Sequence, residues 1–390
     1  LLTAALVVYS AQGLLIPVLA PVTRLVGLEE IDLGAIMTLS AAMLVITGPW
    51  WGREVDRLGV HAVLIRGLIL ATVGTAGFAA MIHVAAESEL PRWLVLGVFA
   101  LTRGVLYGLG FAAIPVAGLT YLASATEGAT ARTQAMGAFG AVQGISLVAG
   151  PAHGGLFAMA GILMPVYIAP VLLVATLAAV YVLPTPSRQE RTATQRLGWR
   201  DSRVLPFLVT GGLLFLGLAL VEVIMGFLVQ DRLGLTDQET AFVVAIAGVL
   251  IGLGFAATQA LLAPRITGGP KALVVGGSVV AACGYAGATF APTLALLLPT
   301  MVIIAIGLGL AIPGFNAGAT LAVGPTEHAA VAGQLAATAG LTYIAGPIMG
   351  AALYAWHPLA PIIGAMLLAL TAGIVSGVAL KQPVNQATQA

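Results

Sequence analysis

The sequence predicts an all-α membrane protein that crosses the bilayer as twelve helices, arranged as two pseudo-symmetric bundles of six. Three observations predict this fold. Of the residues, 59% are hydrophobic and only 8% are charged, whereas a soluble domain carries roughly 25% charged residues. Apolar runs of about 20 residues, long enough to cross a hydrocarbon core of about 30 Å, recur along the chain. The glycine and proline pattern of the first half returns in the second.

The apolar runs are typical of helices rather than of strands. Because lipid offers the backbone no hydrogen-bond partner, only helices and closed barrels span a membrane. A barrel would show segments of about ten residues that alternate apolar and polar side chains, and this chain does not. The fourth and tenth runs are longer than a membrane needs, so we expect those helices to tilt or to extend into water. The expected spans are residues 1–22, 33–51, 62–85, 93–122, 134–158, 162–183, 204–229, 240–262, 272–290, 294–320, 329–354 and 359–380.

Charged residues orient the spans. The connections after even-numbered spans hold most of the basic residues, and those after odd-numbered spans hold most of the acidic ones. By the positive-inside rule both termini then lie in the cytoplasm, and the short loops fit a prokaryotic inner membrane. The one long polar connection predicts an N-terminal bundle over residues 1–183, a cytoplasmic linker over 184–203 and a C-terminal bundle over 204–390. Because Leu1 already lies in an apolar run, we expect the natural N-terminus to precede it.

The two halves carry the same small residues at the same spacing. The fifth span holds Gly137, Gly144, Ala149, Gly150, Pro151 and Gly154, and the eleventh repeats them as Gly333, Gly340, Ala345, Gly346, Pro347 and Gly350. Further matches pair Gly108–Ala112 with Gly307–Ala311, Gly27 with Gly234, Gly59 with Gly269, and Gly67 with Gly277. Two parallel six-helix repeats are an architecture of secondary transporters, in which the binding site lies between the halves near the membrane midplane.

The connection between the second and third spans reads Gly52-Arg53-Glu54-Val55-Asp56-Arg57-Leu58-Gly59. It resembles the signature loop of the major facilitator superfamily, although Val60 and His61 replace the basic residues with which the family usually continues. The resemblance implies that Gly52, Asp56, Arg57 and Gly59 form a conformational latch that stabilises the outward-facing state. Glycines in this loop would permit a tight turn and close helix approach. A plain basic cytoplasmic turn is the alternative.

The fifth span carries Gly137, Gly150, Pro151, Gly154 and Gly155, with Ser146 where one further glycine is expected. These residues resemble the antiporter signature of the same family's twelve-span drug:proton antiporters. The resemblance implies antiport, and therefore export. Small residues also let any two helices pack closely, and proline kinks a helix, so generic helix packing is the alternative.

Two ionisable residues inside apolar runs are candidates for proton coupling. Glu222 is the only carboxylate well inside such a run, and a carboxyl group in apolar surroundings resists ionisation, so it can load and release a proton near neutral pH. Arg103 stands five residues before Gly108, whereas the family places an arginine four residues before a glycine in this span. A mid-membrane arginine is costly unless it faces a cavity or a partner. The alternatives are a structural ion pair for Arg103 and a wet external position for Glu222; we expect His153 to be structural.

Scattered polar residues inside the spans could line a substrate cavity. They lie in spans that border the cavity in the family that the chain resembles, and few of them are charged. An apolar cavity with scattered aromatic and amide groups fits a moderately hydrophobic substrate. The candidates are Tyr9, Gln12, Tyr107, Gln143, Gln259, Asn316, Gln334 and Tyr343.

The remaining features narrow the function classes. The chain has no phosphate-binding Walker loop, no cluster of residues with metal-ligand spacing and a single cysteine, Cys283. The net charge of +1 suggests no nucleic-acid partner. We therefore expect a monomeric secondary transporter, not an enzyme, that uses no cofactor or metal and exchanges a small molecule for protons across the lipid bilayer, driven by the proton gradient. A proton-coupled importer of a nutrient or metabolite and a lipid flippase on the same fold are the alternatives.

Overall fold

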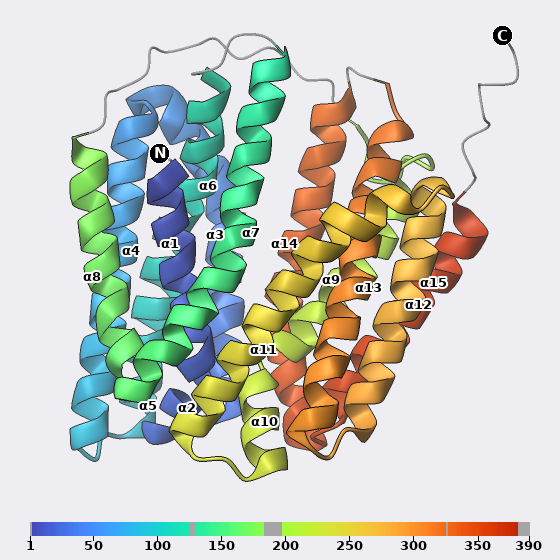
Figure 1. Ribbon diagram of the computed structural model, residues 1–390. Coiled ribbons are helices and arrows are strands. Elements are labelled where there is room, and N and C mark those ends of the chain that lie inside the picture. The colour runs from blue at the N-terminus through green and yellow to red at the C-terminus, as the bar shows by residue number, and fades with distance from the viewer. Residues whose placement is uncertain (1, 125–128, 183–196, 325–326, 381–390) are drawn as a thin grey trace, which may run out of the picture. The chain divides into compact units, whose positions relative to one another are not determined.

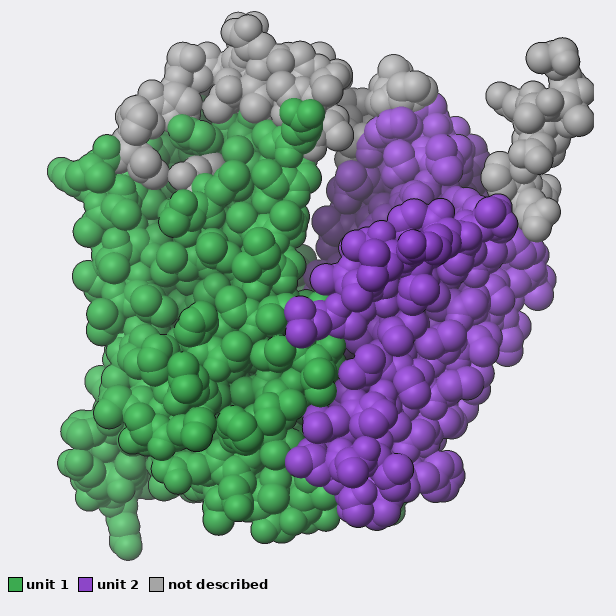
Figure 2. Space-filling model, in the orientation of Figure 1, with its two compact units in different colours: residues 1–191, 219–252, 343–360 green, residues 192–218, 253–342, 361–390 purple. Residues whose placement is uncertain are grey.

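The computed structural model describes residues 2–124, 129–182, 197–324 and 327–380, and these residues contain helices and no strand. The chain divides into two compact units (Figure 2). Unit 1 comprises residues 1–191, 219–252 and 343–360, and unit 2 comprises residues 192–218, 253–342 and 361–390. Unit 1 therefore contains the first six spans and also parts of the seventh, eighth and eleventh spans. The two units do not coincide with the two sequence halves.

Every predicted span falls on a helix (Figure 1). The first six spans are α1 Leu2–Leu15 with η1 Ile16–Val18 and α2 Leu19–Leu25, α3 Glu30–Leu58, α4 Val60–Glu87, α5 Arg92–Phe99 with the π-helical η2 Ala100–Leu106 and α6 Tyr107–Ser124, α7 Ala129–Ala160, and α8 Met164–Tyr181. The last six are α9 Leu205–Glu222 with α10 Met225–Leu233, α11 Asp237–Ala257 with the π-helical η3 Thr258–Leu262 and η4 Ala263–Arg265, α12 Gly269–Phe290, α13 Leu294–Leu321, α14 His328–Trp356, and α15 Ala360–Ala379.

Within the described residues, eleven helical spans are both long and apolar enough to cross a membrane. The remaining predicted span is α7, whose 32 residues reach about 48 Å at 1.5 Å per residue. Its length is therefore sufficient, and its six glycines together with Gln134, Gln143 and His153 lower its hydropathy. With α7 as the twelfth span, the predicted all-α membrane fold is confirmed.

The backbone confirms the internal repeat at its turns. Among the described residues, a positive φ angle occurs only at Gly27 (72°), Gly59 (84°), Gly234 (64°) and Gly269 (68°). Glycine reaches this region without steric cost because it lacks a Cβ atom. The four residues are the two pairs that the sequence repeat matches, Gly27 with Gly234 and Gly59 with Gly269. The duplication therefore extends from sequence to turn geometry.

Helix packing corrects the repeat alignment in the fourth and tenth spans. A Cβ at Gly110 would lie 2.5 Å from the carbonyl oxygen of Gly67, and a Cβ at Gly307 would lie 2.6 Å from that of Gly277. The contacts thus relate Gly110, rather than Gly108, to Gly307. The sequence match was off by two residues because glycines recur at every second position here, so a slip of two still places glycine opposite glycine.

The antiporter-like helix and its repeat partner make the same contact inside unit 1. A Cβ at Gly154 of α7 would lie 2.3 Å from the carbonyl oxygen of Leu14 in α1. A Cβ at Gly350 of α14 would lie 2.2 Å from that of Leu220 in α9. Each glycine thus lets its helix touch the backbone of a neighbour. The predicted close packing by these small residues is confirmed at both copies.

The same two helices also contact the other sequence half within unit 1. A Cβ at Gly248 of α11 would lie 2.8 Å from the ring of Pro151, and one at Gly155 would lie 2.2 Å from Ala245 of α11. A Cβ at Gly34 of α3 would likewise lie 2.7 Å from Ala351 of α14. All these positions lie toward the connections that follow odd-numbered spans. We name this end the predicted external end, and on it helices of both halves are packed together.

Candidate functional site

Arg103 lies in the π-helical stretch η2, inside the fourth span. Because a π-helix forms i→i+5 hydrogen bonds, it takes up the extra residue that places Arg103 five rather than four positions before Gly108. Two glycines of α4 leave room for the widened turn. A Cβ at Gly74 would lie 2.6 Å from the carbonyl oxygen of Thr102, and one at Gly77 would lie 2.8 Å from the Thr102 side chain. The irregular spacing in the sequence thus corresponds to an irregular helix.

A column of aromatic rings continues from the Arg103 guanidinium. Only 3% of Arg103 is exposed, and its Cζ atom lies 3.9 Å from the centre of the Tyr107 ring. The Tyr107 ring stacks on Phe111 with centroids 5.5 Å apart, and Tyr9 of α1 meets Phe111 edge-on at 5.4 Å. We name Arg103, Tyr107, Phe111 and Tyr9 the aromatic column. The structure thus brings three of the predicted residues together through Phe111, which the sequence analysis did not single out.

The column ends beside an exposed face of α7. The Tyr9 hydroxyl is hydrogen-bonded to the side chain of Gln143, which is itself exposed. A Cβ added at Gly137, Gly140 or Gly144 would meet no atom within 4 Å. These three glycines share one side of the helix, so α7 presents bare backbone there. Gly137 therefore differs from the other antiporter-like residues, which pack against neighbours.

Glu222 and Tyr343, two further predicted residues, are in contact. Glu222 ends α9, and its carboxylate accepts a hydrogen bond from the Tyr343 hydroxyl of α14. The Glu222 side chain is exposed. The seventh span is interrupted directly after it, since α10 begins only at Met225. The carboxylate therefore sits where the backbone of its span is broken.

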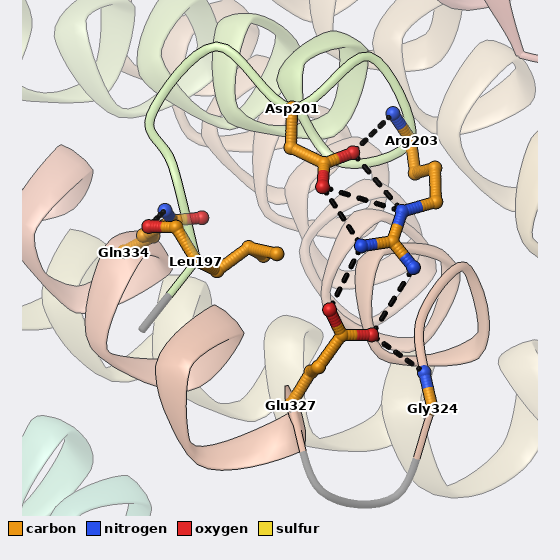
Figure 3. A network of polar contacts seen from close by, with 6 residues as sticks. All are labelled: Leu197, Asp201, Arg203, Gly324, Glu327 and Gln334. Carbon is orange, nitrogen blue, oxygen red and sulfur yellow. Dashed lines mark hydrogen bonds and ion pairs between the residues drawn. The ribbon is translucent and has the colours of Figure 1, made fainter. Parts of the chain in front are cut away.

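The other cavity candidates are dispersed. Gln12 is half-buried on α1, whereas Gln259 on η3 and Asn316 on α13 are exposed in unit 2. Gln334 of α14 is buried, and its Nε2 atom donates to the carbonyl oxygen of Leu197 at 3.0 Å (Figure 3). Gln334 thus has a structural partner at the end of the predicted linker. A substrate contact by any of these four residues stays a prediction.

An ionic network in unit 2 holds the same end of the linker (Figure 3). Arg203 Nη2 donates to Asp201 Oδ2 and to Glu327 Oε1, each at 2.8 Å. The backbone N–H of Gly324 donates to Glu327 Oε2 at 3.1 Å. Hydrogen bonds from Arg203 lower the pKa of Asp201 and of Glu327. Both carboxylates are therefore charged at neutral pH, and they tie the segment before α9 to the connection before α14.

The signature loop departs from its expected geometry at one glycine. Gly59 makes the turn, with a φ angle of 84°. Gly52, however, lies inside α3, and a Cβ added there would meet no atom within 4 Å. The expectation that Gly52 permits the turn or a close helix approach is therefore wrong for this structure. The turn needs only one glycine because α3 stays helical until the residue before it.

The buried acid of this loop is Glu54 rather than Asp56. The Glu54 side chain is 11% exposed and accepts from Arg57 Nη1 at 2.9 Å, with Arg66 Nη1 at 4.0 Å. Asp56 is exposed. Sequence reasoning passed over Glu54 because the family pattern leaves that position open. The latch role of Asp56 and Arg57 stays a prediction.

Two polar residues of α7 are bonded to backbone carbonyl groups. Ser146, which stands where the signature has glycine, is buried and donates to the carbonyl oxygens of Val142 at 2.9 Å and Leu6 at 3.2 Å. The hydroxyl thus ties α7 to α1. His153 Nδ1 lies 2.6 Å from the carbonyl oxygen of Ala149 in its own helix, which favours the structural interpretation of this histidine.

A cluster of polar contacts at the predicted external end was missed by sequence reasoning. Arg24 at the end of α2 donates to Asp231 of α10 at 2.5 and 2.8 Å and to Glu30 of α3 at 2.8 Å. The Tyr354 hydroxyl of α14 donates to Asp231 at 2.7 Å, and Gln230 accepts from Arg24 at 3.0 Å. Hydrogen bonding from Arg24 lowers the pKa of Asp231. We name these five residues the closure cluster, because they join helices of both sequence halves within unit 1.

The internal sequence repeat could have predicted the central ion pair of the closure cluster. Arg24 stands three residues before Gly27, and Asp231 stands three residues before Gly234. The two ends of the ion pair therefore occupy equivalent positions in the two halves. Equivalent residues near a two-fold axis meet one another, so opposite charges at such positions are candidates for a contact.

Comparisons with known proteins agree with this architecture. A family model described as the Major Facilitator Superfamily matches residues 1–347. The chain is 28% identical over 380 residues to the class C tetracycline resistance protein of Escherichia coli, covering 91% of this chain and 90% of that protein. It is 25% identical over 264 residues to Multidrug resistance protein 2 of Bacillus subtilis (strain 168), covering 64% of this chain and 62% of that protein.

Solved structures of low sequence identity share the fold. The human organic anion transporter MFSD10 (TETRAN) has a TM-score of 0.66 at 19% identity, covering 96% of this chain and 97% of that chain. A bacterial homolog of the human lysosomal transporter Spinster, in an inward-facing and occupied conformation, has a TM-score of 0.72 at 14% identity, covering 97% of this chain and 94% of that chain. At such identities the likeness speaks for the fold alone.

Proposed function

Because the chain belongs to the major facilitator superfamily, and is a transporter rather than an enzyme, we propose that it exports a moderately hydrophobic small molecule in exchange for protons. The observation that carries export is the antiporter-like residue set of α7, which touches α1 through Gly154 and α11 through Pro151 and Gly155. These residues stand at the antiporter-signature positions. Relatives named for tetracycline and multidrug resistance support the same direction of transport.

We propose that these contacts form the closed external side of an alternating-access cycle. In a rocker-switch movement the two halves rotate about a central site, so the seams between them open and close as units. Opening the predicted external end must break the seams of α7 with α11 and of α14 with α3, together with the Arg24–Asp231 ion pair. Because the glycine seams leave no room for intervening atoms, close packing makes them either formed or broken.

Glu222 is the proposed proton carrier. As a carboxylate it only accepts hydrogen bonds, and it accepts one from Tyr343; once protonated it also donates. Proton uptake therefore changes the contact between α9 and α14 at the point where the seventh span is interrupted. Arg103 is the proposed charge partner of the cycle, because it is buried and its Nε and Nη1 atoms have no hydrogen-bond acceptor among the described residues.

The same proposal includes the energy source, the oligomeric state and the membrane of the protein. The proton gradient drives transport without a cofactor, and the transporter acts as a monomer in a prokaryotic inner membrane with both termini in the cytoplasm. The basic residues of the even-numbered connections support this orientation. The bacterial origin of the tetracycline resistance relatives supports the membrane.

Uptake of radiolabelled tetracycline into everted membrane vesicles tests the proposal. An exporter is expected to accumulate tetracycline when the vesicle lumen is acidic and to stop when the pH gradient is collapsed. Glu222→Gln is expected to abolish pH-driven accumulation while the protein remains folded, whereas the exposed Glu89→Gln serves as the matched control. Accumulation only in right-side-out vesicles would identify an importer, and unchanged transport by Glu222→Gln would remove this residue from the mechanism.

One observation favours the lipid flippase as a second candidate. An open, apolar groove of about 380 Å³ lies between α7 and α11 in unit 1. Small residues such as Ala152 and Ala245 line it together with Leu156, Met159 and Phe242, so it would fit an acyl chain. In proteoliposomes, a labelled phospholipid that moves out of the outer leaflet lowers the fluorescence of that leaflet. A faster loss than in protein-free vesicles would support this candidate over export of a free small molecule.

A further inference from the structure

Arg103 is a buried cation for which the part of the chain that the structure describes supplies no ion pair. It lies inside a membrane-spanning segment and is 3% exposed, a setting that is unfavourable for a charge that is not paired. Its Nε and Nη1 atoms donate to no acceptor among the described residues. Its closest described partner is the face of the Tyr107 ring, 3.9 Å from Cζ. Such a cation–π contact compensates only part of the lost hydration, and the Nε and Nη1 N–H groups have no acceptor among the described residues.

The helix that carries Arg103 is irregular at this residue. The π-helical turn that carries Arg103 is less favourable than an α-helical turn, and such turns occur frequently at functional sites. Gly74 and Gly77 of α4 pack against Thr102 there, as Gly284 and Gly287 of α12 pack against Thr300 of α13. Because α13 is a regular α-helix at the equivalent contacts, the π-helical turn at this contact belongs only to the half that carries Arg103.

The aromatic column supplies the second half of a binding surface. Its rings lie 5.4–5.5 Å apart in stacked and edge-on contacts, and aromatic rings prefer the same offsets toward an added ring. The column ends at Tyr9, which is half-buried, and at Gln143, which is exposed beside the bare glycine face of α7. A planar ligand can therefore reach the Tyr9 end of the column from the side of α7, and the buried rings of Phe111 and Tyr107 must move for it to reach Arg103.

From this juxtaposition we infer that Arg103 and the aromatic column form a substrate subsite for an anionic group carried on a planar aromatic ring. The guanidinium fork matches a carboxylate through two parallel N–H···O bonds, and the column takes the ring. Tyr107 moves aside from the guanidinium when the anion binds. The inference deepens the proposed export function by naming its substrate class, and it rests on that function only for the direction of transport.

Equilibrium binding of two isosteric probes tests the inference without any gradient, so its failure is distinguishable from a failure of proton-coupled export. Purified protein in phosphatidylcholine nanodiscs is dialysed at pH 7 against 2-naphthoate or 2-naphthamide, with empty nanodiscs as the blank. The wild type is expected to bind the anion at least about tenfold more tightly, the ratio typical of hydrogen bonds to a charged group. Equal affinities, or no saturable binding of either probe, would overturn the inference.

Variants of Arg103 separate charge recognition from support of the fold. Arg103→Gln is expected to lose the preference for 2-naphthoate while it keeps the affinity for 2-naphthamide, and the exposed Arg265→Gln is expected to keep both. An equal loss for both probes would show that Arg103 only supports the column. If Arg103→Gln does not fold, Arg103→Lys decides, because an ammonium lacks the planar fork: the preference is expected to shrink, and an unchanged preference would contradict the inference.

Discussion

Removal of the negative charge of Asp231 is expected to loosen the predicted external end. Asp231→Asn keeps the size of the side chain but removes the ion pair with Arg24, whose two contacts measure 2.5 and 2.8 Å. Because the side chains of Arg24 and Asp231 are 32% and 44% exposed, the ion pair contributes roughly 1 kcal/mol at most. Weakening the hydrogen bond from Tyr354 adds about 0.5–1 kcal/mol. The two changes together are worth about 0.5–2 kcal/mol, so the equilibrium between closed and open forms shifts by about two- to thirtyfold.

A cysteine at Ala20 can report this shift. Ala20 of α2 is 3% exposed, and a Cβ at Gly226 of α10 would lie 2.5 Å from its side chain. In an Ala20→Cys protein with Cys283 replaced by serine, Asp231→Asn is expected to raise the rate of labelling by a membrane-impermeant maleimide about two- to thirtyfold. Glu87→Gln, an exposed change at the same end, should leave the rate unchanged.

The charge-reversed pair completes the test. Arg24→Asp alone is expected to speed the labelling of Ala20→Cys, and its combination with Asp231→Arg is expected to restore a slow rate, because the ion pair is rebuilt in reverse. A labelling rate for Asp231→Asn within twofold of the parent, or a charge-reversed protein that is no slower than either single variant, would refute the assignment of closure to this pair.

Three further predictions use glycine geometry and pH. Gly154→Ala places a Cβ 2.3 Å from a backbone oxygen and should cost about 1–3 kcal/mol by overpacking, seen as a lower Tm, whereas Gly137→Ala in open space should not lower it. Gly59→Ala, at a φ angle of 84°, should lose about 1 kcal/mol or more, whereas Gly52→Ala inside a helix should gain about 0.5–1 kcal/mol; equal Tm values would contradict either reasoning. Arg24 lowers the pKa of Asp231, so closure is fully stabilised above the ordinary aspartate pKa of about 3.9 and is lost only as the pH falls through the lowered value. Ala20→Cys labelling, corrected for thiol ionisation, should therefore stay flat from neutral pH to about pH 5, and a steep rise near pH 6 would exclude Asp231 as the titrating group.

The spans and the duplication were predictable because each depends on residues that are near one another in sequence. Hydropathy marks each membrane crossing independently of its neighbours, and the turn glycines Gly27 and Gly234 recur at matched positions because the same φ angle is needed twice. The alignment of the fourth and tenth spans failed where glycines alternate. There, the register depends on which glycine touches Gly67 or Gly277, and a sequence repeat does not encode that contact.

The candidate site was predictable in its members but not in its geometry. Arg103, Tyr107 and Tyr9 stood out as polar groups in apolar runs, but their alignment depends on a π-helical turn that packs against Gly74 of another helix. Gln334 also stood out, yet its amide is bonded to a backbone carbonyl 137 residues away in sequence. Such pairings follow from tertiary packing, which a single sequence does not reveal.

The charges of Arg24 and Asp231 carry a historical consequence. A symmetric dimer of identical six-helix subunits would bring two arginines or two aspartates together at this point, because both subunits would present the same residue. Like charges at such a distance repel each other. The attraction therefore requires two copies whose sequences were free to diverge, and replacing either residue by its counterpart in the other half would change attraction into repulsion.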